Sequence, residues 1–212
     1  MGIQHRKERE FRRREQEILA AALALFNEDN WQTVTVERIA KEAEIGKGTV
    51  YKHFDSKDEI YARLAIDFHR GIIIELQKID PMLDVITRLK TMIKVFWEGH
   101  IKSREYHRVV MYCARDDFRR CVKEATMQEF EAIDASYAEV VHPLIEQGIE
   151  EGIFPQKPVP LLLFGATAAM NGAIMMAWGG CTTEVDSRLH LEELTNFILA
   201  GLIYQSRTAG SD

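Results

Sequence analysis

The chain contains 212 residues and carries a formal net charge of −6. At roughly 150 residues per domain, this length predicts one or two domains with a sizeable core. Hydrophobic residues make up 46% and charged residues 28%, which argues against intrinsic disorder and against collagen-like or disulfide-stapled scaffolds. The chain has five prolines, and apolar residues recur at helical spacing along most of it. These features exclude an all-β architecture and favour an all-α fold.

The charge is unevenly distributed. Residues 1–57 hold eleven Lys/Arg and ten Asp/Glu, a net charge of +1, whereas residues 58–212 carry −7. Residues 1–14 alone carry +4, which is typical of a basic arm that binds nucleic acid, although a solvated, frayed terminus is the alternative. These basic residues contain no apolar run, so we expect no secretory signal and a cytoplasmic protein.

Helical spacing predicts a first helix over residues 11–29, with Ile18, Ala22 and Phe26 on one face. Thr35 is a plausible N-cap for a short second helix. A tight turn at 44–46 leads into a third segment, residues 47–53. Ser56 is expected to cap a longer helix that ends near residue 78.

Further helices are expected over residues 81–102, 104–115, 117–149, 158–178 and 189–207. We expect the first of these to start at Asp80 and Pro81, because proline loses no hydrogen bond at the first helical position. Gly148, Gly152 and Pro155 should close the long helix.

The stretch from Pro158 to Thr183 contains no charged side chain, and by length alone it could span a membrane. Its two prolines, the mid-span Thr167 and Asn171, and the lack of a flanking basic cluster argue against that interpretation. A helix that is apolar all round must be buried, and its small residues would let another helix approach closely. We therefore expect this helix to be buried between two protomers.

The most informative segment is Thr35–Lys57, where two short amphipathic helices flank a tight turn. A helix-turn-helix needs a second helix that presents polar and basic groups to DNA and keeps its rear face apolar. The pattern places Lys47, Gly48, Thr49 and Lys52 outward and Ile45, Val50 and Phe54 inward.

This segment resembles the helix-turn-helix of TetR-type (TetR/AcrR family) transcriptional regulators. The resemblance covers about fifty N-terminal residues and rests on Thr35, Ile39, Ala40, Ala43, Gly48, Thr49, Val50, Tyr51, Phe54, Ser56 and Lys57. Two residues depart from the family pattern. Glu44 stands where a glycine is usual, and Gly46 stands where serine or alanine often caps the recognition helix. If Glu44 adopts a positive φ, the strain is about 1 kcal/mol.

The resemblance implies a DNA-binding domain over residues 1–57 and a helical effector-binding and dimerisation domain over residues 58–212. It implies a homodimeric repressor, not an enzyme, that binds a palindromic operator in double-stranded DNA under the control of a small molecule. The alternative is a ligand-binding or protein-interaction module of the same fold that does not read DNA.

The resemblance also implies roles for individual residues in DNA binding. Phosphate contacts are expected from Thr35, Tyr51, His53 and Lys57. Contacts at or near base edges are expected from Thr49 and Lys52. Lys47 is expected to face the DNA beside them, and Gly48 leaves room for the DNA. Flanking backbone or minor-groove contacts are expected from Arg12, Arg13 and Arg14. For each of these side chains the alternative is simple solvation, and Thr35 could serve only as a cap.

A second set of residues would serve the effector and the dimer. Methionines and aromatic residues suit an adaptable apolar pocket, so we expect a hydrophobic or amphipathic effector, with plain core packing as the alternative. The candidate effector residues are Phe68, Trp97, His100, Tyr106, Met111, Met127, Phe130, Asn171 and Met175. By family analogy, residues 158–178 and 189–207 of each protomer form a four-helix bundle. The candidate interface residues are Gly165, Ala169, Gly172, Ala173, Met176, Leu194, Phe197 and Ile198.

Other chemistries find little support. His100 and His107 lack a third ligand at metal-binding spacing, so we expect no metal site. Three cysteines, Cys113, Cys121 and Cys181, are too few for a disulfide framework, and a redox switch between the first two is less favoured than simple burial. No nucleotide-binding or nucleophile-base motif occurs, so we expect neither a cofactor nor catalysis.

Overall fold

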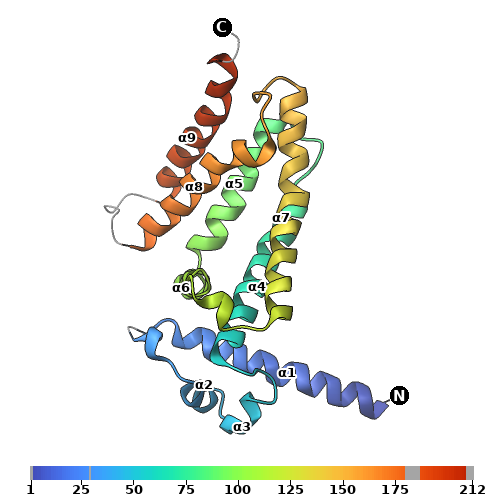
Figure 1. Cartoon of the computed structure of the whole chain (residues 1–212), viewed down its shortest axis with the longest axis vertical. Coiled ribbons are helices and arrows are strands. Elements are labelled where there is room, and N and C mark those ends of the chain that lie inside the picture. The colour runs from blue at the N-terminus through green and yellow to red at the C-terminus, as the bar shows by residue number, and fades with distance from the viewer. Residues whose placement is uncertain (1, 29, 180–186, 209–212) are drawn as a thin grey trace. The chain divides into compact units, whose positions relative to one another are not determined.

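The computed structural model of the chain describes residues 2–28, 30–179 and 187–208, and their side chains from residue 4 to residue 203. Cys181 lies outside the described residues. Over these ranges the chain forms nine α-helices and two short 3-10 helices and no strand, as Figure 1 shows. The expected all-α fold is therefore confirmed.

The chain divides into two compact units. Unit 1 comprises Met1–Arg70 and Ser103–Ile133, and unit 2 comprises Gly71–Lys102 and Asp134–Asp212. The sequence predicts a boundary after Lys57, but compact unit 1 continues past it because Ile60, Tyr61 and Leu64 are buried in the same cluster as the first helix. That residues 1–57 alone form the DNA-binding part stays a prediction.

Unit 1 contains α1 (Gly2–Leu25), α2 (Val36–Glu42), α3 (Lys47–Val50) and α6 (Arg104–Cys113). It also contains the 3-10 helices η1 (Trp31–Thr33) and η2 (Phe118–Arg120), and the first parts of α4 (Lys57–Gln77) and α7 (Glu124–Glu150).

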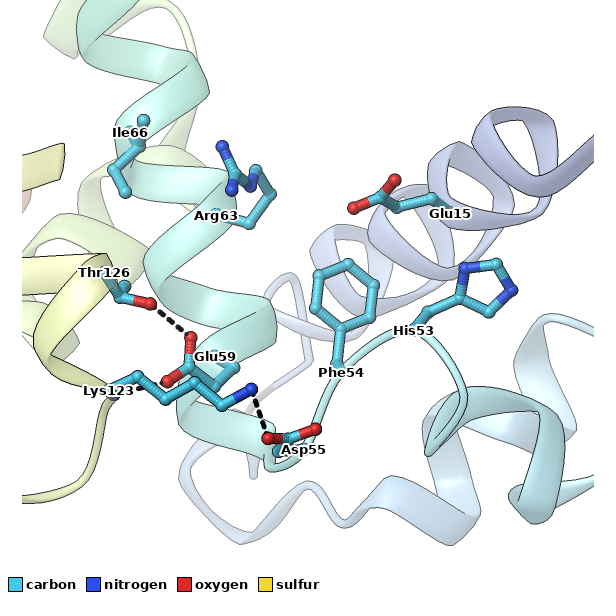
Figure 2. A pocket seen from close by; sticks show the side chains of 9 residues that line it. All are labelled: Glu15, His53, Phe54, Asp55, Glu59, Arg63, Ile66, Lys123 and Thr126. Carbon is cyan, nitrogen blue, oxygen red and sulfur yellow. Dashed lines mark hydrogen bonds and ion pairs between the residues drawn. The ribbon is translucent and has the colours of Figure 1, made fainter. Parts of the chain in front are cut away.

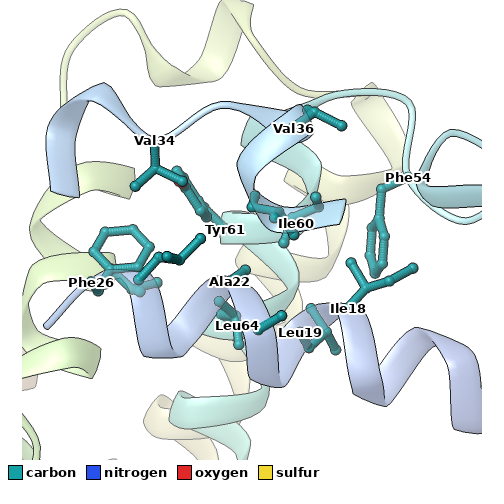
Figure 3. Close-up of a cluster of buried hydrophobic side chains, with 14 of the residues drawn as sticks. Ile18, Leu19, Ala22, Phe26, Val34, Val36, Phe54, Ile60, Tyr61 and Leu64 are labelled. Atoms are coloured by element: carbon teal, nitrogen blue, oxygen red, sulfur yellow. The ribbon is translucent and has the colours of Figure 1, made fainter. Parts of the chain in front are cut away.

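The core of unit 1 explains how these elements are held together. Ile18, Ala22 and Phe26 lie on one face of α1 and are fully buried, as the sequence predicts. Figure 3 shows them packed against side chains of α4, including Tyr61. The Tyr61 ring lies 4.6 Å from that of Phe26 and 4.8 Å from that of Tyr112. Since a fully buried large apolar side chain contributes roughly 1.5–3 kcal/mol, this cluster fixes α6 and α4 on the helix-turn-helix.

Two helix starts test the sequence-based expectations. Ser56 caps α4 as expected, because its hydroxyl accepts a hydrogen bond from the Glu59 amide at 3.2 Å. The expected start at Pro81 is wrong, since α5 (Val85–Ile101) begins after Asp84. The Asp84 carboxylate accepts the Thr87 amide at 2.9 Å, and such an N-cap prevails over the weaker preference of proline for the first turn.

The sequence predicts that the long helix α7 starts at residue 117, but the helix starts at Glu124. The preceding residues form η2, which buries Phe118 in the core of unit 1. The burial of one aromatic ring thus prevails over the continuous helical pattern.

Unit 2 contains α5, α8 (Val159–Trp178) and α9 (Ser187–Thr208), which contact one another, and the ends of α4 and α7. The indole of Trp178 donates to the His100 carbonyl at 3.1 Å, and that of Trp97 donates to the Ser187 hydroxyl at 3.3 Å. These bonds give the buried Trp97 and the half-buried Trp178 polar partners at the junction of the three helices.

A tight turn closes α7, as the glycines predict. Gly152 has a φ of +71°, and the Phe154 amide donates to the Gly148 carbonyl at 3.0 Å. The Phe154 ring lies directly over Gly148, so that a Cβ on this glycine would come within 2.3 Å of the ring.

Gly148→Ala is therefore expected to lower the free energy of unfolding by about 1–3 kcal/mol, since the new methyl group overpacks a buried contact. Gly71→Ala is the matched control, because Gly71 is exposed within α4 and no atom lies within 4 Å of its Cβ position. It should raise stability by up to about 1 kcal/mol through helix propensity. Chemical denaturation of both variants checks the pair, and equal effects would contradict the assigned packing.

Candidate nucleic-acid interface

The turn between α2 and α3 has a well-defined geometry. The Ile45 amide donates to the Ala40 carbonyl at 2.9 Å, and the Glu44 amide donates to the Lys41 carbonyl at 3.1 Å. This pair of hydrogen bonds is the Schellman motif, which places its central residue in the left-handed region. Glu44 occupies that position with a φ of +54°, so the strain expected from the sequence is present.

Glu44→Gly is expected to raise the free energy of unfolding by about 0.5–1 kcal/mol, because glycine adopts this φ without steric cost. Glu42→Gly, the same change at the last residue of α2, should instead lower stability by about 1 kcal/mol. Thermal and urea unfolding show whether the two substitutions change the free energy of unfolding in opposite directions. A destabilised Glu44→Gly protein would show that the turn carries no strain.

The third helix is short, and its faces are sharply divided. α3 spans Lys47–Val50, and hydrogen bonds from the Tyr51 and Phe54 amides continue one further helical turn. Val50 and Phe54 are buried as predicted. The opposite side is polar and open to solvent, with Lys47, Gly48, Tyr51 and Lys52 exposed and Thr49 half-buried.

Thr35 and Lys47 each have a partner within the motif. The Thr35 hydroxyl accepts the Arg38 amide at 3.3 Å, so its predicted role as N-cap of α2 is confirmed. Lys47 forms an ion pair with Glu37, and this hydrogen bond raises the pKa of Lys47. Its ammonium also lies 5.6 Å from the centroid of the Tyr51 ring. These contacts hold Lys47 and Tyr51 on the same exposed surface.

Lys57 is less available to DNA than the sequence suggests. Its ammonium donates to the Val34 carbonyl at 3.0 Å and lies 5.7 Å from the Tyr61 ring and 5.6 Å from the Tyr112 ring. It thus ties the start of α4 to the residues before α2. Its contact with phosphate stays a prediction.

His53 likewise has a packing role. Its ring lies 4.0 Å from that of Phe11 in α1, and its buried Nδ1 has no hydrogen-bond partner. Burial lowers the pKa of His53, and the nearby Glu15 carboxylate opposes this effect. A neutral imidazole is a weaker phosphate ligand than a cation, so the structure lends its predicted phosphate contact no support.

The basic arm is helical. α1 begins at Gly2, so the basic residues form its exposed first half. Arg12 pairs with Glu8 at 2.7 Å, and Arg14 pairs with Glu17 at 2.6 Å. Arg13 also lies 3.6 Å from Glu17. The frayed alternative is therefore wrong for residues 2–14, whereas DNA contacts of the three arginines stay a prediction.

Sequence reasoning missed two residues that hold this region together. Phe11 shares the helical stripe of Ile18, seven residues on, and that register was the available signal. Arg108 of α6 donates to the carbonyls of Phe26 and, at 3.1 Å, of Glu28. It thereby ties α6 to the segment that follows α1, and no local pattern around Arg108 indicates this long-range contact.

The comparisons with known proteins agree with this geometry. The family model for bacterial regulatory proteins of the tetR family matches residues 18–64, the segment that forms the core, the turn and α3. The HTH-type transcriptional repressor KstR2 of Mycobacterium tuberculosis is 28% identical over 139 residues, which cover 65% of this chain and 68% of that protein. The chain is thus similar to tetR-family transcriptional regulators, and the family model matches its helix-turn-helix segment.

Two further proteins are similar to this chain. The HTH-type transcriptional regulator HbdR of an Aromatoleum species is 30% identical over 107 residues, which cover 50% of this chain and 40% of that protein. The crystal structure of the transcriptional regulator FadR from Bacillus subtilis, in complex with stearoyl-CoA, has a TM-score of 0.73 at 17% identity and covers 88% of this chain and 98% of its own. At that identity FadR shows the shared fold. KstR2 and HbdR are transcriptional regulators.

The nine candidate effector residues fall into both units. Unit 1 holds Phe68, Tyr106, Met111, Met127 and Phe130, and unit 2 holds Trp97, His100, Asn171 and Met175. Phe68 and Tyr106 stack with their ring centroids 5.0 Å apart, and Phe130 packs on the core of unit 1.

Three of these effector assignments conflict with the observed exposure. Asn171 and Met175 lie on an exposed side of α8, and Met111 is also exposed. They do not line the interior of the protomer, because the faces of α6 and α8 that pack inward carry other residues. His100 is buried, with its Nδ1 2.9 Å from the Phe96 carbonyl, and burial lowers its pKa. The effector role of the remaining residues stays a prediction.

A polar cleft of about 190 Å³ lies within unit 1, and none of the candidate effector residues lines it. Figure 2 shows its lining. Glu59 accepts hydrogen bonds at 2.6 Å from both the Lys123 amide and the Thr126 hydroxyl. Lys123 pairs with Asp55. Because these charged groups satisfy one another, we do not assign the cleft as an effector site.

The apolar surface of α8 and α9 is unusually exposed. Phe164 is 74% exposed and Phe197 69%, and Met176 is also exposed. Gly165 and Gly172 are exposed as well, with no atom within 4 Å of their Cβ positions. Ala169 and Ala173 are half-buried.

Two residues predicted for the dimer interface are not available at this surface. Leu194 and Ile198 are buried within their own protomer, because they lie on the side of α9 that packs inside unit 2. Their predicted place in the dimer interface is therefore wrong, and both belong to the core of unit 2.

Within the described residues, α8 is long and apolar enough to cross a membrane, and 17% of its most apolar stretch is buried. Length and composition alone are weak evidence, because helices of soluble proteins pass the same test. Among the described side chains, no group of three or more His, Cys, Asp or Glu could hold a metal ion.

Proposed function

We propose that this TetR-family protein is a homodimeric repressor that binds a palindromic operator and responds to a hydrophobic or amphipathic effector. The observation that carries the proposal is the division of α3 and the turn after it, where buried Val50 and Phe54 leave the side with Lys47, Gly48 and Lys52 open. A major groove about 12 Å wide admits such a helix. The repressor function is supported by the similarity to KstR2, a transcriptional repressor.

A dimer would cover the exposed face of α8 and α9. A face that holds Phe164 and Phe197 is costly to leave in water at about 25 cal/mol per Å², and a second copy of the same charge-free helix matches it in chemistry. Gly165 and Gly172 would let the two copies of α8 approach closely. A four-helix bundle of this kind would set the separation of the two α3 helices, and half-sites one helical turn apart require about 34–36 Å.

The effector class is proposed from chemistry. The charge-free α8 and the aromatic residues of α5 favour an apolar ligand, and FadR of the same fold binds stearoyl-CoA. A long-chain acyl-CoA is therefore the first probe to test. As is typical of this family, we expect a cytoplasmic protein in which residues 1–57 contact DNA and residues 58–212 hold effector and dimer contacts.

The test is operator binding measured by fluorescence anisotropy with and without stearoyl-CoA. The operator is a palindrome that the protein protects in the DNA upstream of its own gene. We expect binding that is at least about 10³-fold tighter than to unrelated DNA, and release on addition of acyl-CoA. Equal affinity for all DNA would favour the alternative module that does not read DNA. If acyl-CoA, free CoA and fatty acid all leave specific operator binding unchanged, the proposed effector class is contradicted, while the proposed repressor function still stands.

A further inference from the structure

The open side of the helix-turn-helix carries an acidic side chain, Glu37, that the function proposed above does not explain. Glu37 lies in the first turn of α2 and is exposed. Its carboxylate pairs with the ammonium of Lys47, the first residue of α3. Because α2 and α3 are neighbours (Figure 1), this ion pair bridges the two helices of the motif. A carboxylate repels the phosphates of DNA, so at this surface it lowers affinity unless the DNA supplies a donor for it.

Two contacts hold the Lys47 ammonium in place. It donates a hydrogen bond to the Glu37 carboxylate, and it lies 5.6 Å from the centroid of the Tyr51 ring. The hydrogen bond from Lys47 lowers the pKa of Glu37, so the carboxylate is charged at neutral pH. Val36 of α2 and Val50 of α3 are buried, whereas the ion pair lies on the side of the two helices that is open to solvent.

The ion pair still has hydrogen-bonding capacity for another partner. A lysine ammonium has three donors, and the bond to Glu37 uses one of them. A carboxylate has about four acceptor sites, of which Lys47, the Thr35 hydroxyl and the Glu37 amide take up to three. The pair therefore presents free donors and a free acceptor side by side.

This arrangement matches the major-groove edge of a G·C base pair. Guanine presents the acceptors N7 and O6, and cytosine presents the N4 amine donor next to O6. An ammonium that donates to guanine and a carboxylate that accepts from cytosine would keep the hydrogen bond to each other. In an A·T pair the adenine amine replaces guanine O6 and would face the ammonium. In the reversed pair, thymine offers a single acceptor beside its methyl group.

We propose that Glu37 and Lys47 act as one unit that recognises a G·C base pair in each half-site, with Lys47 on guanine and Glu37 on cytosine. The inference rests on the DNA binding proposed above and adds Glu37 to the residues that determine specificity. On unrelated sequences the carboxylate faces acceptor atoms, which lowers affinity for the wrong DNA. Specificity thus arises from repulsion as well as attraction.

The test compares Glu37→Gln with Glu42→Gln in the full-length protein. Glu42 is exposed at the end of the same helix, so both variants remove one negative charge from α2. Bound sequences are selected from a randomised half-site. We expect the unaltered protein and Glu42→Gln to select G·C at one symmetric position. Glu37→Gln should lower this preference by about 5- to 150-fold, and Lys47→Gln should lower it at the same position.

A modified operator tests the cytosine contact without a change in the protein. In N4-methylcytosine, a methyl group replaces the amine hydrogen that points into the major groove. At the selected position it should weaken binding by the unaltered protein but not by Glu37→Gln.

Three results would overturn the inference while leaving DNA binding intact. They are an unchanged G·C preference in Glu37→Gln, equal losses of preference in Glu37→Gln and Glu42→Gln, or effects of Glu37→Gln and Lys47→Gln at different positions. A lack of sequence-specific binding by the unaltered protein would instead overturn the proposed function itself.

Discussion

Gly172→Arg is expected to convert the proposed dimer into monomers and to weaken operator binding by about 10²–10⁴-fold. Gly172 lies on the exposed apolar face of α8, with no atom within 4 Å of its Cβ position. An arginine there would bury an unpaired charge between the two copies, which is strongly unfavourable. Loss of the dimer removes the avidity of two linked half-sites, which is worth this range of affinity.

The matched control is Gly71→Arg, the same substitution at an exposed glycine of α4 that also has open space at its Cβ position. It should leave both the mass and the operator affinity unchanged. Sedimentation equilibrium measures the mass, and circular dichroism shows that both variants stay folded. A dimeric Gly172→Arg protein would place the interface elsewhere.

Lys52→Ala is expected to weaken operator binding and to change which base is preferred at one symmetric position of each half-site. The Lys52 side chain is exposed on the outer side of the turn that follows α3. A base contact by lysine contributes about 1–3 kcal/mol of discrimination, so two half-sites together should lose about 2–6 kcal/mol. Selection of bound sequences from a randomised half-site measures the change in preference.

Lys41→Ala on α2 is the control, since Lys41 is exposed on the neighbouring helix and carries the same charge. It should weaken binding equally for all sequences or leave it unchanged. A uniform loss from Lys52→Ala, with no change in base preference, would reduce Lys52 to a phosphate contact.

Local features of the chain could be predicted well from the sequence. The buried stripe of Ile18, Ala22 and Phe26, the cap at Ser56 and the positive φ of Glu44 all follow from contacts within a few residues. Short-range spacing determines such features because the partners lie one or two helical turns apart. The start of α5 was predicted wrongly because two neighbouring helix-start signals, Pro81 and Asp84, compete. Only the hydrogen bond from the Thr87 amide to Asp84 decides between them.

Long-range contacts could not be predicted in this way. Arg63 and Glu129 are 66 positions apart in the chain, and their bidentate contact at 2.9 and 3.0 Å leaves no local pattern. The same holds for Lys57, whose ammonium is engaged by a backbone carbonyl and two aromatic rings. The compact boundary of unit 1 follows from such contacts, and therefore differs from the one drawn after Lys57.

For the candidate site, the sequence correctly predicts which side of the recognition segment is buried and which is exposed. It predicts the contacts of individual side chains less well. The spacing of Val50 and Phe54 correctly separates an inner from an outer side. It cannot tell that His53 packs on Phe11, because that partner lies more than forty residues earlier in the chain. The effector residues illustrate the same limit, since an apolar residue on a helix such as Met175 fits a core, a pocket or an outer surface equally well.

The most direct measurement is a salt titration of the unaltered protein with its protected palindrome and with a scrambled duplex of the same length. We expect both affinities to fall steeply with salt and the palindrome to stay at least about 10³-fold tighter throughout. The stoichiometry should be two chains per palindrome. Equal affinities for the two duplexes, or a palindrome occupied by a single chain, would contradict paired reading of DNA by the exposed side of α3.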